Sequence, residues 1–387
     1  MPNLHETKYV ERAILIQVVH ARMDPAEAAD SLLELARLAD TAGLEIAAQL
    51  TQHREKPDGG TLLGSGKVED LKTLIAEKSA NTVIADNNLN AFQAYNLAKA
   101  TGARVMDRAE VILEIFARRA RSSEAQTQVE LAKTQFLLAR IPVTESQQRF
   151  TGGGANVRGP GESHLNLRNA PLRRRISELK KKLAAIQSRQ TTRDHSKREW
   201  PVVCLVGYTN AGKSTLLNAL AGADAYVDDR LFATLDTKTR KVWLAPSREI
   251  LLTDTVGFIR NLPHGLVASF KSTLDVAVNA DLLLVVVDAA YPCVADHIDV
   301  CFRTLKEIGA DNVPHLLILN KCDTLTGSAP NAAATSLQHL SRQYPQALPV
   351  SAQTGYGLDL LKRAMTEELK TCCTLWRLPS SVFPASP

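Results

Sequence analysis

The sequence lacks the features of exported, disulfide-bonded or membrane-spanning proteins. Its six cysteines form no C-x-x-C pair, which argues against a disulfide framework or a zinc site and for reduced thiols. The longest strongly apolar run, Leu282–Val287, is too short to span a bilayer. The N-terminus shows no basic and then apolar signal. We therefore expect a cytoplasmic protein with no integral membrane segment, and leave peripheral association with a membrane open.

The chain also lacks a strong overall charge, because its net charge is only +5 over 387 residues. This charge is unevenly distributed. The segment from Arg118 to Arg198 carries 18 Lys or Arg against six acidic residues, a net +12, which leaves −7 on the rest of the chain. A basic segment beside acidic neighbours indicates a polyanionic partner that contacts one part of the molecule. We expect that partner to be RNA rather than DNA.

One stretch predicts a phosphate-binding loop. Gly207 and Gly212 frame the pattern G-x-x-x-x-G-K-S, which follows the apolar run 202–206 and precedes a helix-like segment. The glycines let backbone N–H groups turn toward one anion, and the N-terminus of the helix adds partial positive charge. Lys213 is placed to reach the β- and γ-phosphates, and Ser214 offers a hydroxyl to Mg²⁺.

Three further stretches, each after an apolar run, favour guanine nucleotides. Asp254 and Gly257 end a predicted strand, where a carboxylate can hold Mg²⁺ through water and a glycine N–H can approach the γ-phosphate. The sequence N-K-C-D ends in Asp323, whose carboxylate can accept two hydrogen bonds from guanine but not from adenine. A Ser-Ala-Gln stretch, 351–353, fits the loop that meets the guanine oxygen. The four motifs in this order predict a G domain.

The residues of these motifs resemble those of the HflX family of ribosome-associated GTPases, which belongs to the translation-factor class. The resemblance implies that 232–236 is switch I and that Thr234 joins Ser214 as a ligand of Mg²⁺ in the GTP state. The residues predicted to bind GTP are Gly207, Tyr208, Thr209, Asn210, Ala211, Gly212, Lys213, Ser214, Thr215, Phe232, Ala233, Thr234, Leu235, Asp236, Asp254, Thr255, Val256, Gly257, Asn320, Lys321, Cys322, Asp323, Ser351, Ala352 and Gln353.

The N-terminal part alternates predicted strands and helices. Strands are expected over 11–20, 44–50, 82–85 and 104–106, with helices over 25–42, 68–78 and 91–100. This alternation predicts a small parallel α/β domain. Its glycine-rich turn, 60–67, misses the phosphate-loop pattern, so both a structural turn and a nucleotide or nucleic-acid contact remain open. The family resemblance adds ATP binding by this half as a further open alternative.

Two heptad-like segments follow the N-terminal part. Apolar or small residues recur at spacings of 4, 3, 4, 3 over 125–139 and again over 172–186. These seams predict an antiparallel helical hairpin whose second helix begins at Pro171. The basic residues lie mostly outside these apolar seams. They form either a solvated helix face or a stripe that contacts RNA, and we expect the stripe. The residues predicted to contact RNA are Arg158, Arg173, Arg174, Arg175, Lys180, Lys181 and Lys182.

The connection between these helices, 143–170, is long and rich in glycine, which suits insertion into a narrow RNA cavity. Its R-G-P-G-E-S stretch resembles a loop that reaches toward the peptidyl-transferase centre in the HflX family. The family commonly has an acidic run after this loop, whereas here residues 164–171 lack two acids and add a proline.

The sequence therefore predicts an α/β protein: a P-loop GTPase domain preceded by a small parallel α/β domain and a basic antiparallel helical hairpin. We expect boundaries at 1–110, 111–199, 200–368 and a tail, 369–387. Phe258 stands where many GTPases have Gln, so we expect slow hydrolysis completed by a partner. We expect a monomer, and the resemblance implies that it binds the large ribosomal subunit with GTP and splits or rescues stalled ribosomes. The alternative is a GTP-dependent switch on another RNA or protein.

Overall fold

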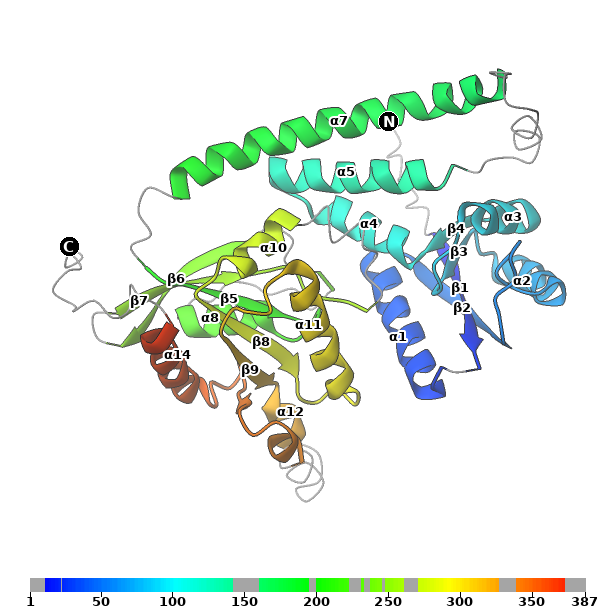
Figure 1. Cartoon of the computed structure of the whole chain (residues 1–387). Coiled ribbons are helices and arrows are strands. Elements are labelled where there is room, and N and C mark those ends of the chain that lie inside the picture. Colours follow the sequence, from blue (N-terminus) through cyan, green and yellow to red (C-terminus); the bar gives the residue numbers. More distant parts are fainter. Residues whose placement is uncertain are drawn as a thin grey trace, which may run out of the picture. The chain divides into compact units, whose positions relative to one another are not determined.

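The computed structural model describes residues 11–21, 23–141, 160–194, 200–222, 231–232, 237–245, 248–260, 271–326 and 339–372 (Figure 1). The chain divides into two compact units, one made of Met1–Arg118 and Gln126–Leu183, the other of Arg119–Ala125 and Ala184–Pro387. Each unit is built on one mostly parallel sheet.

The first unit contains a four-stranded parallel sheet in the order β2-β1-β3-β4. Its strands are β1 (Arg12–His20), β2 (Glu45–Arg54), β3 (Thr82–Ala85) and β4 (Arg104–Asp107). The helices that connect or follow these strands are α1 (Pro25–Thr41), α2 (Ser65–Lys78), α3 (Ala91–Thr101) and α4 (Arg108–Arg119). The predicted strands and helices are all present, and β2 extends four residues beyond its expected end.

The strand order explains how the helices cover this sheet. The chain moves from β1 to β2 in one direction and then from β2 to β3 and β4 in the other, so right-handed crossovers place α1 opposite α2 and α3 (Figure 1). One core joins Ile14 and Ile16 of β1 to Leu71 of α2 and Leu97 of α3. All four of these side chains are fully buried.

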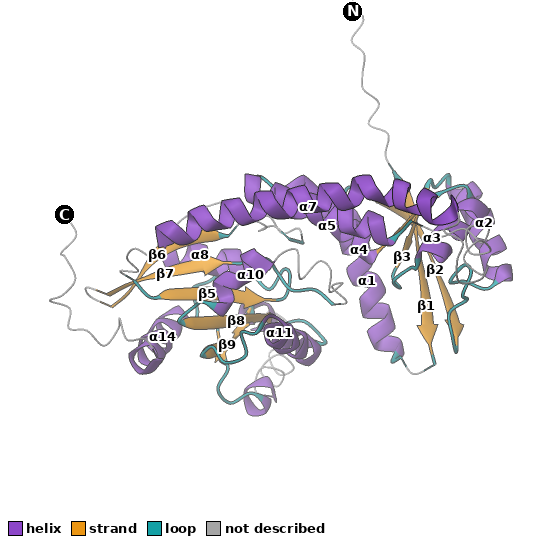
Figure 2. Cartoon of the chain, turned by 45° about the horizontal axis from the view of Figure 1, so that its top comes forward, coloured by secondary structure: helices purple, strands orange, loops and turns teal. Residues whose placement is uncertain are grey.

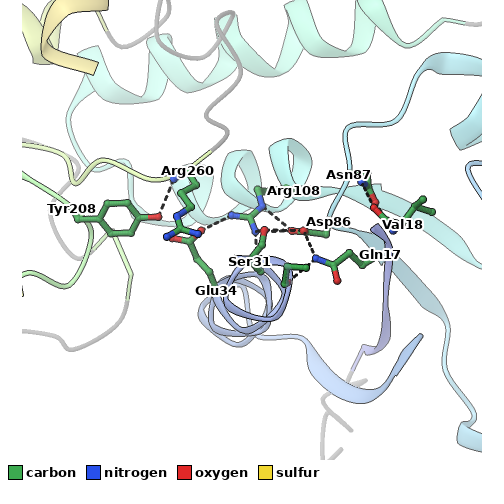
Figure 3. A network of polar contacts seen from close by, with 10 residues as sticks. Gln17, Val18, Ser31, Glu34, Asp86, Asn87, Arg108, Tyr208 and Arg260 are labelled. Carbon is green, nitrogen blue, oxygen red and sulfur yellow. Dashed lines mark hydrogen bonds and ion pairs between the residues drawn. The ribbon is translucent and has the colours of Figure 1, made fainter. Parts of the chain in front are cut away.

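A buried arginine links the elements on the other face of this sheet (Figure 3). Arg108 is 0% exposed, and burial would lower the pKa of its guanidinium if acids did not compensate. Its Nη1 lies 2.6 Å from Glu34 and its Nη2 lies 2.6 Å from Asp86, while Ser31 accepts a further bond. Two carboxylates around one guanidinium keep its pKa above the usual value. No local sequence pattern predicts this network, because its members come from three separate helices and strands.

The glycine-rich turn, 58–64, is held by Asp58 within it and by Gln52 of β2. The Asp58 carboxylate accepts the N–H groups of Gly60 at 2.8 Å and Thr61 at 3.0 Å, and these bonds lower the pKa of Asp58. The Gly64 N–H is bonded to Gln52 at 3.0 Å. Side chains of the turn and of β2 therefore occupy N–H groups that a phosphate loop would offer to its ligand. These contacts favour the structural alternative for this turn.

The helical hairpin consists of α5 (Ser123–Ala139) and α7 (Pro160–Asp194), which run antiparallel and side by side (Figures 1 and 2). Val129, Ala132 and Leu179 of the predicted seams are buried. The Arg175 guanidinium bridges the two helices, with Nη2 2.5 Å from a Glu130 oxygen. The antiparallel hairpin is therefore confirmed.

The prediction that the second helix begins at Pro171 was wrong. Helix α7 starts at Pro160 and passes through Pro171 without a break, so residues 160–170 are helical rather than part of the connection. Pro160 suits the first turn of a helix, where its missing N–H has no partner to lose. Pro171 removes one hydrogen bond, and the strong helix formers that follow it continue the helix. The rest of the connection, 142–159, lies outside the described residues.

The second unit contains a six-stranded sheet in the order β10-β9-β8-β5-β7-β6, parallel except for β6 (Figure 2). Its strands are β5 (Val202–Gly207), β6 (Lys238–Ala245), β7 (Arg248–Asp254), β8 (Leu282–Asp288), β9 (His315–Asn320) and β10 (Leu348–Pro349). Its helices are α8 (Lys213–Ala221), α10 (Lys271–Val278), α11 (Val294–Ile308), α12 (Cys322–Thr326) and α14 (Leu358–Cys372).

Both faces of this sheet are covered by apolar cores. Leu216 of α8 and Met365 of α14 pack on one face, and Leu274 of α10 and Ile298 of α11 pack on the other. Strand β8 contains the apolar run Leu282–Val287, lies between β5 and β9 and is buried on both sides along that run, as a central strand of a parallel sheet requires. This arrangement confirms the predicted P-loop GTPase fold class.

Candidate functional site

The phosphate-loop motif lies between β5 and α8, where the backbone requires glycine at both framing positions. Gly207 has φ 146°, and a Cβ there would lie 2.1 Å from the backbone oxygen of Val286. Gly212 has φ 88°, and a Cβ there would lie 2.3 Å from the amide nitrogen of Asn320. The loop is therefore pressed against β8 and the base-recognition motif. Asn210 also has a positive φ of 60°, which this residue type tolerates.

Lys213 opens helix α8 and folds its side chain over the loop. The Nζ donates to the carbonyl oxygens of Gly207 at 3.0 Å and Tyr208 at 2.8 Å. The residue is only 7% exposed, and this burial lowers the pKa of Lys213. The cation is thus fixed beside the N–H groups of the loop. A negative charge placed there would offset the cost of burying the ammonium group.

Ser214 and Asp254 form the candidate metal position. The Ser214 hydroxyl donates to Asp254 Oδ2 at 2.6 Å, and Asp254 is fully buried at the end of β7. A hydroxyl and a carboxylate are the oxygen donors that Mg²⁺ prefers. The neighbouring Thr255 hydroxyl bonds to the Leu205 carbonyl at 2.7 Å and so fixes β7 against β5 at this edge. The chemistry of this pair fits a bound divalent cation.

The residues after Asp254 lie directly against the phosphate loop. A Cβ on Gly257 would lie 2.8 Å from Cα of Thr209 and 3.1 Å from Nζ of Lys213, so only glycine fits without displacement. The Phe258 side chain is 3% exposed and belongs to the core under α10 and α11. Phe258 therefore packs in the interior and offers no polar group to a nucleotide.

Asn320 joins the N-K-C-D and Ser-Ala-Gln stretches, which are predicted to recognise the base, to the predicted phosphate loop. Its Nδ2 donates to the Ala211 carbonyl at 2.8 Å, and its Oδ1 accepts the N–H of Ala352 at 3.0 Å. Ser351 is fully buried and its Oγ accepts the N–H of Thr354, whereas Gln353 is exposed. One buried amide thus ties together three of the four predicted motifs.

The rest of the N-K-C-D stretch turns sharply from β9 into α12. Lys321 has φ 63°, and its Nζ lies 2.9 Å from Asp288 at the end of β8. The Cys322 thiol bonds to the Leu319 carbonyl, and burial raises its pKa to about 11. Asp323 lies in the first turn of α12. The ion pair with Asp288 was not expected from the sequence, although an acid at the end of a central strand was a signal that could have suggested it.

The structure brings most of the predicted nucleotide residues to one edge of the sheet. The stretches 207–215, 254–257, 320–323 and 351–353 all lie at the carboxyl ends of parallel strands, where open α/β sheets bind ligands. Phe232 is buried with φ 55°. Ala233, Thr234, Leu235 and Asp236 lie outside the described residues, as does Arg158.

The predicted RNA-contacting residues that the structure describes lie on α7. Arg173, Arg174, Arg175 and Lys180–Lys182 are all exposed. Arg174 and Arg175 approach Glu178 on the same helix, at 3.4 and 3.5 Å. Within the described ranges, no helix combines the length and hydropathy needed to cross a membrane.

Three parts of the chain match known protein families. Residues 29–117 match the family described as GTP-binding GTPase N-terminal, and residues 119–197 match GTP-binding GTPase Middle Region. Residues 202–321 match the family described as 50S ribosome-binding GTPase.

Individual proteins are similar over most of the chain. GTPase HflX of Caldanaerobacter subterraneus is 42% identical over 93% of this chain and 81% of its own length. GTPase HflX of Alkalihalophilus pseudofirmus is 43% identical over 82% of this chain and 75% of its own length. A crystal structure of a GTP-binding protein from Sulfolobus solfataricus in complex with GDP covers 94% of this chain and 99% of its own, at 25% identity and a TM-score of 0.46. By its identity to the HflX proteins and its coverage of them, this chain belongs to the HflX family of GTPases.

Proposed function

We propose that this GTPase binds the large ribosomal subunit in its GTP state, splits or rescues stalled ribosomes, and is released after hydrolysis. The main support is that one chain combines two features. The four predicted nucleotide-binding stretches lie at one edge of the second sheet, and exposed basic residues line α7. The match of residues 202–321 to a 50S ribosome-binding GTPase family supports the large subunit as the partner. Basic side chains at such a surface neutralise phosphates of RNA.

In this proposal, different residues at the edge of the second sheet bind different parts of the nucleotide. Lys213 neutralises charge on the β- and γ-phosphates, and the Gly257 N–H faces the γ-phosphate. The Asp323 carboxylate accepts hydrogen bonds from guanine, and Asn320 holds that stretch in register with the loop through its two bonds. The remaining residues of the four stretches shape the pocket through their backbone.

Mg²⁺ is the cofactor we propose for this site. Ser214 and Thr234 would hold the ion, with Asp254 acting through water. When bound, Mg²⁺ supplies positive charge that stabilises the phosphate oxygens during transfer. The Ser214 hydroxyl and the buried Asp254 carboxylate already provide oxygen donors for it.

Hydrolysis should depend on the partner, because Phe258 is packed in the core and cannot orient water. We expect the protein alone to hydrolyse GTP slowly, and purified large subunits to accelerate it at least ~10-fold. Small subunits provide the control, since they test whether any ribosomal RNA suffices. Co-sedimentation with large subunits should be stronger with a GTP analogue than with GDP.

Two results would overturn the ribosomal proposal. If saturating large subunits leave the rate unchanged, the chain acts on a different partner. If structured RNA of non-ribosomal origin accelerates hydrolysis as strongly as the large subunit, the alternative of a switch on another RNA holds instead.

A further inference from the structure

The second residue of the phosphate loop makes a contact that no sequence motif requires. Tyr208 is 3% exposed, and its hydroxyl accepts the backbone N–H of Arg260 at 3.0 Å (Figure 3). Arg260 lies just beyond Gly257 and Phe258. The Tyr208 side chain therefore holds the backbone just after Gly257, the residue whose N–H is proposed to face the γ-phosphate.

Helix α11 contacts the Tyr208 ring through His297. The Tyr208 ring stacks on His297 with centroids 3.7 Å apart and planes within 8°. His297 in turn stacks on Tyr291 at 4.1 Å and 20°. Asp296, the residue before His297 on α11, pairs with the Arg260 guanidinium at 3.1 Å. The same turn of α11 thus supports Tyr208 and contacts the residue that Tyr208 holds.

Two backbone bonds continue this attachment along the loop. The Phe258 N–H donates to the Gly207 carbonyl at 2.9 Å, and the Thr209 N–H donates to the Phe258 carbonyl at 2.8 Å. Together with the Tyr208 hydroxyl, they fasten residues 258–260 to residues 207–209. Gly257 is the residue immediately before this fastened stretch, and it packs against Thr209 and Lys213.

We propose that Tyr208 is a positioning residue for GTP hydrolysis: supported by His297, its hydroxyl holds the backbone at Arg260 and keeps Gly257 aligned with Lys213. Tyr208 acts through Gly257 and touches no phosphate with its side chain. The backbone of the loop binds GDP and GTP alike, so the hydroxyl matters only when the γ-phosphate is present. This inference rests on the proposed nucleotide site and does not involve the ribosome.

The test compares Tyr208→Phe with Tyr291→Phe, which removes the same hydroxyl from the far ring of the same stack. Tyr208→Phe keeps the ring on His297 and leaves the Arg260 N–H without its acceptor. We expect GDP affinity, measured with a fluorescent GDP, to stay within about twofold of wild type. Single-turnover hydrolysis at saturating GTP should fall at least ~5-fold, in line with the loss of one buried hydrogen bond. Tyr291→Phe should match wild type in both measurements.

A double-mutant cycle with His297→Ala tests the support from α11. If His297 acts through the Tyr208 hydroxyl, the double variant should hydrolyse GTP no more slowly than the worse single variant. Additive losses would show that His297 acts independently, which would overturn its part in the proposal.

The remaining outcomes separate this proposal from the site itself. Unchanged hydrolysis in Tyr208→Phe would overturn the positioning role. Equal loss of GDP and GTP affinity with a lower melting temperature would also overturn it, because Tyr208 would then only stabilise the fold. Failure of the wild-type protein to bind GTP would instead overturn the proposed nucleotide site.

Discussion

Asp323 carries the proposed choice of base, and its position makes that choice testable. It lies in the first turn of α12, directly after the β9 stretch that Asn320 ties to the phosphate loop. Asp323→Asn replaces an acceptor with a donor opposite the guanine edge. GTP affinity should fall at least ~10-fold, and xanthosine triphosphate should bind better than GTP. Competition binding with both nucleotides measures this change.

The matched control for Asp323→Asn is Asp359→Asn. Asp359 also lies in the first turn of a helix of the same unit, α14, and is exposed. Its substitution should leave the affinities for both nucleotides unchanged. If Asp323→Asn binds GTP as tightly as this control does, guanine is recognised elsewhere.

Residues that share a short motif were predictable, and contacts between distant residues were not. Lys213, Ser214 and Asn320 lie where the motifs placed them, because a strand, a turn and a helix start leave local signals in the sequence. The ion pair of Lys321 with Asp288 and the bond between Tyr208 and Arg260 depend on which strands become neighbours. No local pattern contains that information.

At the scale of elements, α5 is joined to the first sheet by an arginine near its end. Arg140 pairs with Asp107, at the end of β4, and lies 3.4 Å from Glu110 of α4. Asp107 is only 2% exposed, so removing Arg140 leaves a buried carboxylate without its cation, although the N–H groups of Leu89 and Glu110 still donate to it. Arg140→Ala should therefore destabilise the region of β4, α4 and α5 by about 1–3 kcal/mol. Amide hydrogen exchange of these elements in the full chain measures the effect.

The comparison variant for α5 is Arg175→Ala, which removes the ion pair with Glu130. Both of these side chains are about half exposed, at 50% and 46%. Solvent screens such an exposed pair and it contributes little to stability, so hydrogen exchange should change little. Equal effects of the two substitutions would contradict the distinction between a buried and an exposed attachment.

Helix α7 shows where element prediction fails. The seam spacing located a helix correctly, and Leu179 of α7 is buried, as is Val129 on the facing helix α5. Its start was misplaced by eleven residues because Pro171 was interpreted as a boundary. A proline removes one backbone bond, but whether a helix ends there depends on the residues on both sides.

At the scale of the whole molecule, the basic residues of α7 should govern binding to the partner without affecting the nucleotide. Replacing Lys180, Lys181 and Lys182 with Gln should weaken co-sedimentation with large subunits. It should also reduce the salt dependence of binding, by about one unit of slope for each RNA phosphate that a lysine no longer neutralises. GTP affinity should stay unchanged. Co-sedimentation over a series of KCl concentrations measures the strength of binding and its salt dependence.

The control for charge alone replaces three lysines of α2, Lys67, Lys72 and Lys78, with Gln. It changes the net charge by the same amount on another helix of the same unit. Binding and salt dependence should then remain close to wild type. If both triple variants weaken binding equally, the interaction depends on overall charge and not on α7.

Burial of the thiols around the nucleotide site bears on how this enzyme withstands oxidants. Burial raises the pKa of Cys204, that of Cys301 to about 12 and that of Cys322 to about 11. At neutral pH the Cys322 thiol therefore stays protonated, whereas the thiolate is the form that peroxide attacks. Cys372, on α14, is exposed. We therefore expect oxidants to reach the exposed thiol of Cys372 more readily than the buried thiols around the candidate nucleotide site.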